Sequence, residues 1–444
     1  MKYDIGVSEA IIISSHNGYK PFVGSIGIVG KTISLVKVGG LCRDECNVFI
    51  NATGKILMPG LFNIHCHGDM TLARGLGDSL TLAEQNELFA EHDWFYSFIN
   101  DEDRYYSRQL TYCEALLSGT TFIVENMYWS LGKKSVNAMS EVGIKGALAE
   151  DIRVSFKDAD AFIGEKELID FETECKANNI IPVIGSISEE DFQTERLINI
   201  NRIINQLSTF QTFHLAENDW RVKLIQDKYQ SWPIEYLYNL NLLNENVIAS
   251  HVVYATKKEI KQLAQTKTVV ANTPLCEMKI ADGIAPIPEM IKKGVLVCLG
   301  TDGAMWNNSN DIFREMKGMS LLHSVNSGVR SLGLNDILDM ATINGAKAFK
   351  LDGDYGTIEE GKKATFILIE TNVPHLQPIR LGKYENVRSM IVYNATGQDV
   401  TDVFIDGKHI VKDRTIQTID VNKIINKVQE TSNRISESLQ KNNY

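Results

Sequence analysis

Apolar runs that end in polar residues, each followed by a stretch with helical spacing, repeat between about residue 58 and about residue 350. This alternation is typical of parallel β/α units, in which a crossover helix follows each strand. Eight such units close a (β/α)8 TIM barrel, so we predict an α/β fold of that kind. The runs are 61–67, 119–128, 143–154, 180–188, 210–217, 246–254, 267–274 and 294–303.

The segments before and after this region have a different pattern. Residues 1–57 and 356–419 contain short runs rich in Ile and Val with Gly and Asn between them, which is typical of strands joined by turns. We predict that both chain ends build one small β-sandwich domain, and that residues 58–355 form the barrel. Residues 420–444 have apolar residues at helical spacing, which predicts a C-terminal surface helix.

Charge and cysteine content limit the partners and the compartment. The formal net charge is −11 without long runs of one sign, so the electrostatic footprint of a nucleic-acid-binding protein is missing. The amino-terminal apolar run is about four residues long, too short for a signal peptide or a membrane span. The seven cysteines are an odd number and scattered, which indicates no disulfide framework. We expect a cytoplasmic protein without a nucleic-acid or membrane partner.

Four of the nine histidines fall at the ends of predicted barrel strands. His65 and His67 are two residues apart, and the two-residue period of a strand places both imidazoles on one face. His214 closes the fifth run, His251 lies in the sixth, and Asp302 closes the eighth. Singly, each is better explained as a hydrogen-bonded core residue or a helix-capping acid. Together, at the end where barrels carry their sites, they predict a metal site that suits zinc or ferrous iron.

Glu217 follows His214 by three residues in the motif HLAEN. This spacing places a carboxylate near the metal in a position suited to moving protons. Zinc lowers the pKa of a bound water towards about 7, and a nearby carboxylate can then deliver a proton to a substrate ring nitrogen. The alternative is an acid in the first turn of a helix, stabilised by the helix dipole.

Seven motifs occur in one order along nearly the whole chain: MPGLFNIHCHGDM, SGTTF, HLAEN, ASHVVY, KIADGIAPIPEM, LGTDGAMWNN and IEEGKKATFILIE. In this order they resemble the amidohydrolase superfamily. Within it, the chain looks most like the branch that holds S-adenosylhomocysteine/methylthioadenosine deaminases, s-triazine chlorohydrolases and guanine deaminase. The segments PHLQPI and MIVYNATGQDVTDVFIDGKHIV also resemble the closing β domain of that branch.

The resemblance implies a mononuclear metal held by His65, His67, His214 and Asp302. It also implies that Asp302 accepts the proton of the attacking water, that His251 hydrogen-bonds the water or the tetrahedral intermediate, and that Glu217 protonates the ring nitrogen. Because no lysine at a predicted strand end suggests a second, bridged metal, we expect one divalent metal per chain, zinc before iron. Many barrels of this branch are dimers or tetramers, so a homo-oligomer is a further expectation.

The sequence departs from that branch around the substrate. The histidine-bearing segment that follows the fourth strand in adenosine-type deaminases is missing, and Ser97 stands about where a ribose-binding Glu would fall. After the seventh strand the usual H-N-P-x-S-N-M-K reads NTPLCEMK, so Asn272 replaces the His and Glu277 replaces the second Asn. If Glu277 faces the pocket, it would suit a substrate with an amino or protonated ring group. Its alternative is a solvated acid at a helix start.

Aromatic residues offer a wall on which a planar heterocycle could stack. Trp94, Phe95 and Tyr96 lie in the long segment after the first strand, and Trp306 follows Asp302 closely. The competing interpretation of such a cluster is packing between helices.

These observations predict a metal-dependent hydrolase acting on carbon–nitrogen bonds other than peptide bonds. The first hypothesis is hydrolytic deamination of an aminated heterocycle of purine, nucleoside, pterin or triazine type, by attack of metal-bound hydroxide. The second is removal of chloride or an alkylamine, or opening of a cyclic amide, at the same site, because the ligands do not decide the leaving group. The third is a barrel without catalysis, which the retention of every expected polar residue disfavours.

Overall fold

The computed structural model describes residues 2–92, 98–128, 132–151, 153–155, 158–162 and 164–441. The chain divides into two compact units. One unit comprises residues 1–63, 114–122 and 311–419, and the other comprises residues 64–113, 123–310 and 420–444. We describe each unit by itself. The predicted domain boundaries at 57/58, 355/356 and 419/420 stay a prediction.

The predicted barrel is confirmed as an eight-stranded sheet in which neighbouring strands follow the order of the chain. Each predicted apolar run contains one strand, and most of their residues are buried, as expected where a parallel sheet is covered on both faces. The strands are β6 (Leu61–Cys66), β7 (Thr120–Asn126), β8 (Lys145–Asp151), β11 (Ile181–Ile187), β12 (Phe210–Leu215), β13 (Val247–His251), β14 (Val269–Asn272) and β15 (Val297–Leu299).

Backbone hydrogen bonds join the last strand of this sheet to the first. The amides of Thr301 and Asp302 both donate to the carbonyl of His65, at 3.0 and 2.9 Å. Gly300 makes this approach feasible, because a Cβ there would lie 2.8 Å from the Cβ of His65. The contact places the end of β15 directly against the end of β6.

The helices of this unit follow the strands, as crossover helices should. They are α1 (Leu82–His92), α3 (Asp101–Leu117), α4 (Lys133–Val142), α5 (Glu165–Ala177), α6 (Thr194–Leu207), α7 (Asp219–Tyr229), α8 (Pro233–Asn239), α9 (Lys257–Thr266), α10 (Pro274–Lys279), α11 (Ile287–Lys292) and α16 (Val421–Lys441). A hairpin of β9 (Arg153–Ser155) and β10 (Asp158–Phe162) follows β8. Capping explains where individual helices begin: Asn218 accepts from the amide of Arg221 at the start of α7, and Thr256 and Glu259 form a capping box at α9.

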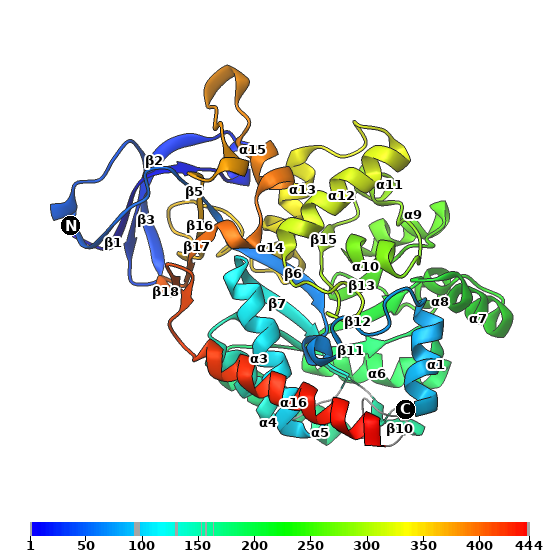
Figure 1. The fold of residues 1–444 in the computed structure, drawn as a ribbon. Helices are drawn as coiled ribbons and strands as arrows, with labels where there is room; N and C mark the ends of the chain where they lie inside the picture. The colour runs from blue at the N-terminus through cyan, green and yellow to red at the C-terminus, as the bar shows by residue number, and fades with distance from the viewer. Residues whose placement is uncertain are drawn as a thin grey trace. The chain divides into compact units, whose positions relative to one another are not determined.

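The C-terminal helix α16 lies along α3 (Figure 1). Thr431 donates to Asp103 at 2.6 Å, and the guanidinium of Arg434 pairs with the same carboxylate. Ile435 is buried in an apolar cluster that also contains Trp306 and Ile99. The helix predicted from the apolar spacing is therefore present, and one face of it is packed.

The other unit contains a nine-stranded mixed sheet built from both ends of the chain, as predicted. Its strands are β1 (Tyr3–Ile12), β2 (Phe22–Val29), β3 (Thr32–Val38), β4 (Cys46–Asn51), β5 (Lys55–Pro59), β16 (Phe366–Glu370), β17 (Val400–Ile405), β18 (Lys408–Lys412) and β19 (Thr415–Ile416). The amino-terminal strand β5 pairs antiparallel with the carboxy-terminal strand β16, which joins the two halves. Figure 1 shows β1, β2 and β3 on one side of this sheet. Its core is apolar and includes Ile26, Phe366 and Phe404.

The same unit holds the helices that precede β16 and a short helix that follows it. They are α12 (Ile312–Ser327), α13 (Leu334–Ala341), α14 (Ile343–Ala348) and the short α15 (Val387–Ser389). Among the described residues, no helix is long and apolar enough to cross a membrane.

Candidate metal centre

Four side chains converge at the carboxyl ends of three barrel strands. His65 lies in β6 with His67 directly after it, His214 lies in β12, and Asp302 follows β15 by three residues. All four are at most 4% exposed. They come together because the carboxyl ends of parallel strands meet at one end of a barrel. The structure thus places the predicted ligands side by side.

Three distances between their donor atoms are close to those expected between the ligands of one metal ion. His67 Nε2 lies 3.2 Å from His214 Nε2 and 3.5 Å from Asp302 Oδ1, and His65 Nε2 lies 3.7 Å from the same oxygen. Ligand atoms bound tetrahedrally to zinc at 2.0 to 2.1 Å lie about 3.3 Å apart. Two overlapping groups meet the geometry of a metal site: His65, His67 and His214, and His65, His251 and Asp302.

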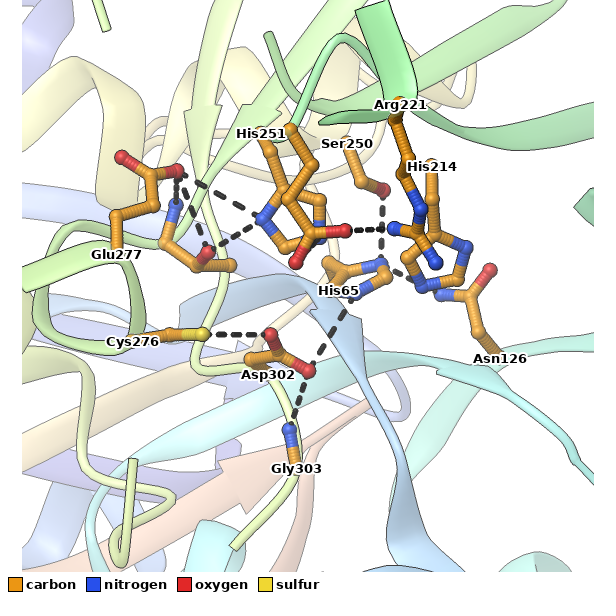
Figure 2. A network of polar contacts seen from close by, with 12 residues as sticks. His65, Asn126, His214, Arg221, Ser250, His251, Cys276, Glu277, Asp302 and Gly303 are labelled. Atoms are coloured by element: carbon orange, nitrogen blue, oxygen red, sulfur yellow. Dashed lines mark hydrogen bonds and ion pairs between the residues drawn. The ribbon is translucent and has the colours of Figure 1, made fainter. Parts of the chain in front are cut away.

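Hydrogen bonds at the far side of the ring orient two of the imidazoles, those of His67 and His65. His67 Nδ1 lies 2.6 Å from the carbonyl oxygen of Asn126, and because a carbonyl can only accept, Nδ1 carries the hydrogen and Nε2 presents its lone pair. His65 Nδ1 lies 2.8 Å from Ser250 Oγ and 2.9 Å from the Asn126 amide (Figure 2). Such outer contacts are typical of metal-binding histidines, because they fix the ring and its tautomer.

The electrostatics of the site also suit a cation. Burial lowers the pKa of His67 to about 3 and lowers the pKa values of His65 and His214, so these imidazoles are neutral. Burial alone would raise the pKa of Asp302, but His65 and His67 outweigh it and lower that pKa below its ordinary value. Neutral imidazoles and an ionised carboxylate are the forms that bind a metal. The donor set and its geometry therefore fit a divalent metal ion.

Backbone strain marks two of the residues at the site. His251 and Asp302 have φ values of 69° and 62°, a left-handed region that side-chain-bearing residues rarely adopt. Each ends or closely follows a barrel strand, where the turn redirects the side chain. Asp302 is held by the amide of Gly303 at 2.6 Å and by the thiol of Cys276, whose sulfur lies 2.9 Å away (Figure 2).

Glu217 lies at the site and forms an ion pair with Arg221, which was not predicted from the sequence. Its Oε1 lies 3.8 Å from His251 Nε2. Its other oxygen pairs with the guanidinium of Arg221, four residues later in the chain. Arg221 also binds Glu190 at 2.8 Å. Glu217 precedes α7 and Arg221 lies in its first turn, and this four-residue spacing of opposite charges was a signal available in the sequence.

Two further carboxyl groups lie near Glu217. Burial raises the pKa of Asp282 to about 9, with the charge of Glu217 adding to the rise. Burial likewise raises the pKa of Glu189 to about 8, and its Oε1 accepts from the amide of Ala216 at 2.5 Å. Both are neutral around pH 7, so the carboxyl-rich region carries less negative charge than its composition suggests.

Glu277 and Asn272 are each 1% exposed. Glu277 Oε1 lies 3.7 Å from His251 Nδ1, whereas Glu217 Oε1 lies 3.8 Å from Nε2, the other nitrogen of the same ring. Asn272 Nδ2 donates to both Glu277 oxygens, at 2.7 and 3.0 Å. Their assignment to the substrate stays a prediction.

Trp306 packs near the candidate ligands, and Tyr128 joins it. The ring of Tyr128 stacks on the ring of His67 with centroids 4.4 Å apart. The ring of Trp306 contacts the ring of His67 edge-on, with centroids 5.4 Å apart. Trp306 is also part of the apolar cluster that contains Ile435, and its contact with a substrate stays a prediction. The predicted contact of Trp94, and the aromatic loop 94–96, lie outside the described residues.

A buried ion-pair network stands behind His65 and His67. Arg108 donates to Glu125 at 2.7 Å, to Asp69 at 3.1 Å and to Ser135 at 3.1 Å, and Tyr112 donates to the second oxygen of Glu125. Glu125 precedes Asn126 in β7. The pattern of apolar runs contained no signal for this network, because it depends on which face of α3 meets the barrel.

Comparison with known proteins agrees with this geometry. A model of the amidohydrolase family matches residues 56–410. The 5'-deoxyadenosine deaminase of Methanosphaera stadtmanae is 33% identical over 89% of this chain and 91% of its own length. The 5-methylthioadenosine/S-adenosylhomocysteine deaminase of Desulfitobacterium hafniense is 30% identical over 94% of this chain and 95% of its own length.

Solved structures share the fold at lower identity. A zinc-bound adenosine deaminase from Xanthomonas campestris has a TM-score of 0.88 and 22% identity, with 98% of this chain and 99% of that chain covered. The zinc-bound atrazine chlorohydrolase of Arthrobacter aurescens has a TM-score of 0.84 and 18% identity, with 96% and 100% covered. The family model spans most of the chain, including the strands that end in the candidate ligands, and the predicted resemblance is confirmed: this chain belongs to the amidohydrolase family.

Proposed function

We propose that this chain is a hydrolytic deaminase that removes the amino group of an aminated heterocycle, with one zinc ion per chain held by His65, His67, His214 and Asp302. The observation that carries the proposal is the convergence of these four donors with Glu217 and His251 in one buried site. When bound, the metal supplies a Lewis acid that lowers the pKa of water and makes hydroxide available near neutral pH.

The protein side chains divide the proton transfers. Asp302 is ionised in this setting and accepts the proton of the attacking water through Oδ1 or Oδ2. Glu217 Oε1 faces His251, and this carboxyl group delivers a proton to the ring nitrogen next to the attacked carbon. His251 Nε2 points into the same space and hydrogen-bonds the developing oxyanion. Asp302 then passes the proton that it accepted from the water to the amino group, and ammonia leaves as the bond between this nitrogen and the attacked carbon breaks.

The substrate is a small heterocycle, and an adenine nucleoside is the first candidate. Relatives that cover about nine-tenths of this chain are named for deamination of 5'-deoxyadenosine and 5-methylthioadenosine, which favours deamination over removal of chloride or an alkylamine. The aromatic pair of Tyr128 and Trp306 next to His67 offers faces for a planar base. A cytoplasmic location, a homo-oligomer and zinc rather than iron are parts of this proposal.

Elemental analysis of the purified protein, followed by an ammonia assay, tests the proposal. We expect about one zinc per chain, with ammonia released from 5'-deoxyadenosine or methylthioadenosine, or otherwise from aminopurines, pterins or aminotriazines. His65→Ala should lose both metal and activity, whereas the matched change at the exposed His16 should lose neither. Two metals per chain would overturn the mononuclear site, and a protein that takes up no zinc would favour a barrel without catalysis.

The role of Glu217 has a separate test. Glu217→Gln keeps the size of the side chain but cannot carry the proton, so ammonia release should fall by about 100-fold or more while zinc content is unchanged. Undiminished ammonia release by this variant would remove Glu217 from the mechanism. Chloride or alkylamine as the product from a triazine, without ammonia from any amine tested, would favour the alternative hydrolysis.

A further inference from the structure

We propose that Glu277 is a positioning residue for His251, acting through the hydroxyl of Thr273, and that it does not contact the substrate. The proposal rests on the proposed function, because it assigns a role within that reaction. It concerns the segment after β14, where this chain departs from the related enzymes in sequence.

The carboxylate of Glu277 is enclosed by its own segment of chain. Glu277 lies in α10, and its side chain is 1% exposed. Four contacts with donors surround its two oxygens: Asn272 Nδ2 at 2.7 and 3.0 Å, and the amide and hydroxyl of Thr273 at 3.3 and 3.4 Å. Three of these contacts fall on Oε1, and at 1% exposure the carboxylate is bound within its own segment of chain.

The direction of these hydrogen bonds determines that Nδ1 of His251 carries a hydrogen. An ionised carboxylate only accepts, so the hydroxyl of Thr273 donates its single hydrogen to Glu277. The same hydroxyl lies 3.0 Å from His251 Nδ1, and it can therefore only accept there. Nδ1 must carry a hydrogen, which leaves Nε2 as the atom turned towards Glu217 and the candidate metal ligands.

A second contact holds the backbone of His251. Asn272 Nδ2 also lies 3.2 Å from the carbonyl oxygen of His251, whose φ of 69° is strained. The carboxylate of Glu277 lies 3.7 Å from Nδ1, too far for a hydrogen bond but close enough for attraction in a buried site. Figure 2 shows the line of contacts from Glu277 to His251. Glu277 and Asn272 therefore fix the ring and the main chain of one residue together.

Kinetics of two substitutions with a matched control test this role. Thr273→Val removes the hydroxyl at nearly constant volume, and Glu277→Gln removes the charge that directs it. Both should lower kcat by about 10- to 100-fold, the usual effect of losing an outer partner of a site histidine. KM should stay within about threefold. Thr273→Ser keeps the hydroxyl and should retain kcat within about threefold of the wild type.

The opposite kinetic pattern would overturn the proposal. A large rise in KM for Glu277→Gln, with kcat unchanged, would mean that Glu277 binds substrate directly. Unchanged kcat and KM in both Thr273→Val and Glu277→Gln would mean that the contact with His251 has no part in the reaction.

Nuclear magnetic resonance provides a readout that needs no substrate. In zinc-loaded protein with 15N-labelled histidine, the ring signals of His251, assigned by their loss in His251→Gln, should show a protonated Nδ1 in the wild type and in Thr273→Ser. Thr273→Val should change that signature while zinc content stays at the wild-type level. If no amine is deaminated but the signature behaves as expected, the proposed function fails and the positioning of His251 stands. A wild-type His251 without a hydrogen on Nδ1 would refute the positioning role itself.

Discussion

Two buried regions of this protein are built on opposite principles. The core of the nine-stranded sheet is apolar, and Phe366 and Phe404 stack there with ring centroids 4.5 Å apart. The carboxyl end of the barrel buries charged and polar groups to a similar degree: His65, Arg108, His251, Glu277 and Asp302 are each at most 3% exposed. Burial stabilises the first region directly. In the second it costs free energy unless each charge is paired.

The difference indicates that the residues of the sheet core contribute to stability, whereas the buried polar residues at the carboxyl end of the barrel serve the proposed reaction. Side chains of the sheet core can be exchanged for others of similar volume without touching a reacting group. At the barrel end, each group is held by a partner that itself needs a partner, as in the series Asn126, His65 and Asp302. We therefore expect perturbations of the two regions to give different signatures, and four experiments can break or sharpen this contrast.

Removal of the metal should have the largest effect. A strong chelator should reduce ammonia release by about three orders of magnitude or more, because the attacking water loses its Lewis acid. Zinc should restore it. Metal present at about a thousand times its dissociation constant stabilises the folded state by about 4 kcal/mol, so the free energy of unfolding should fall on chelation.

Hydrogen exchange locates the effect of chelation. Protection should decrease at β6, β12 and the turn after β15, and stay unchanged at β16 and β17. Equal loss of protection in both sheets would contradict the separation of the two regions.

Substitution of the buried cation Arg108 should have the second largest effect. Arg108→Met leaves the carboxylates of Glu125 and Asp69 buried without their shared partner, which should lower the free energy of unfolding by about 3 to 5 kcal/mol. The control is Arg314→Met, because the Arg314 side chain is 63% exposed and its loss should change stability by less than about 0.5 kcal/mol.

Urea unfolding measures these changes in the free energy of unfolding. It is applied to both Arg variants and to the double substitution Arg108→Met/Glu125→Gln. The double variant should recover part of the loss, because one uncompensated charge is removed. Similar stability of Arg108→Met and Arg314→Met would show that the network contributes little.

The pH dependence of stability should have opposite signs in the two regions. In the barrel unit, burial raises the pKa of Glu189 from 4.5 to about 8. Between these values the unfolded chain releases a proton that the folded chain keeps, so the free energy of unfolding decreases as pH rises from about 4.5 to 8. The slope for one proton is at most about 1.4 kcal/mol per pH unit. Glu189→Gln should remove this contribution.

In the sheet unit, Asp402 behaves in the reverse way. Burial alone would raise its pKa, but His409, Thr401 and Lys55 outweigh it and lower the pKa below its ordinary value of 3.8. Its contribution is therefore present above the unfolded pKa and is lost as the pH falls below it. Urea unfolding at several pH values, with Asp402→Asn as the second variant, checks both signs. A Glu189→Gln variant with the wild-type slope between pH 5 and 8 would contradict the assignment.

The smallest effect should come from trimming the sheet core. Phe404→Leu removes part of a buried ring and should lower the free energy of unfolding by about 1 kcal/mol, with little cavity left because Leu fills much of the space. The kcat and the zinc content should equal those of the wild type. A loss of activity larger than the loss of stability explains would show that the sheet contributes to the site.

Much of the fold and of the site could be predicted because it depends on periodicity along the chain. Each apolar run became one strand, and the two-residue spacing of His65 and His67 put both rings at one site. The relation of His214 and Asp302 to them followed from a general rule, since the carboxyl ends of parallel strands meet. The side-chain contacts that depend on which face of a helix is turned towards the barrel could not be predicted. Arg108 on α3 carries no mark in the sequence that distinguishes a buried guanidinium from an exposed one.

Sequence alone therefore determined which residues end the barrel strands, because strand length and alternation are local properties of the chain. Only the tertiary structure decided which atom faces which neighbour. Glu277 illustrates the reason: its distance along the chain from Asn272 is small and fixed, but its contact with His251 depends on how α10 packs behind β13 and β14. Side-chain partners across separate strands are set by packing of the whole barrel, and no segment of the sequence contains that information by itself.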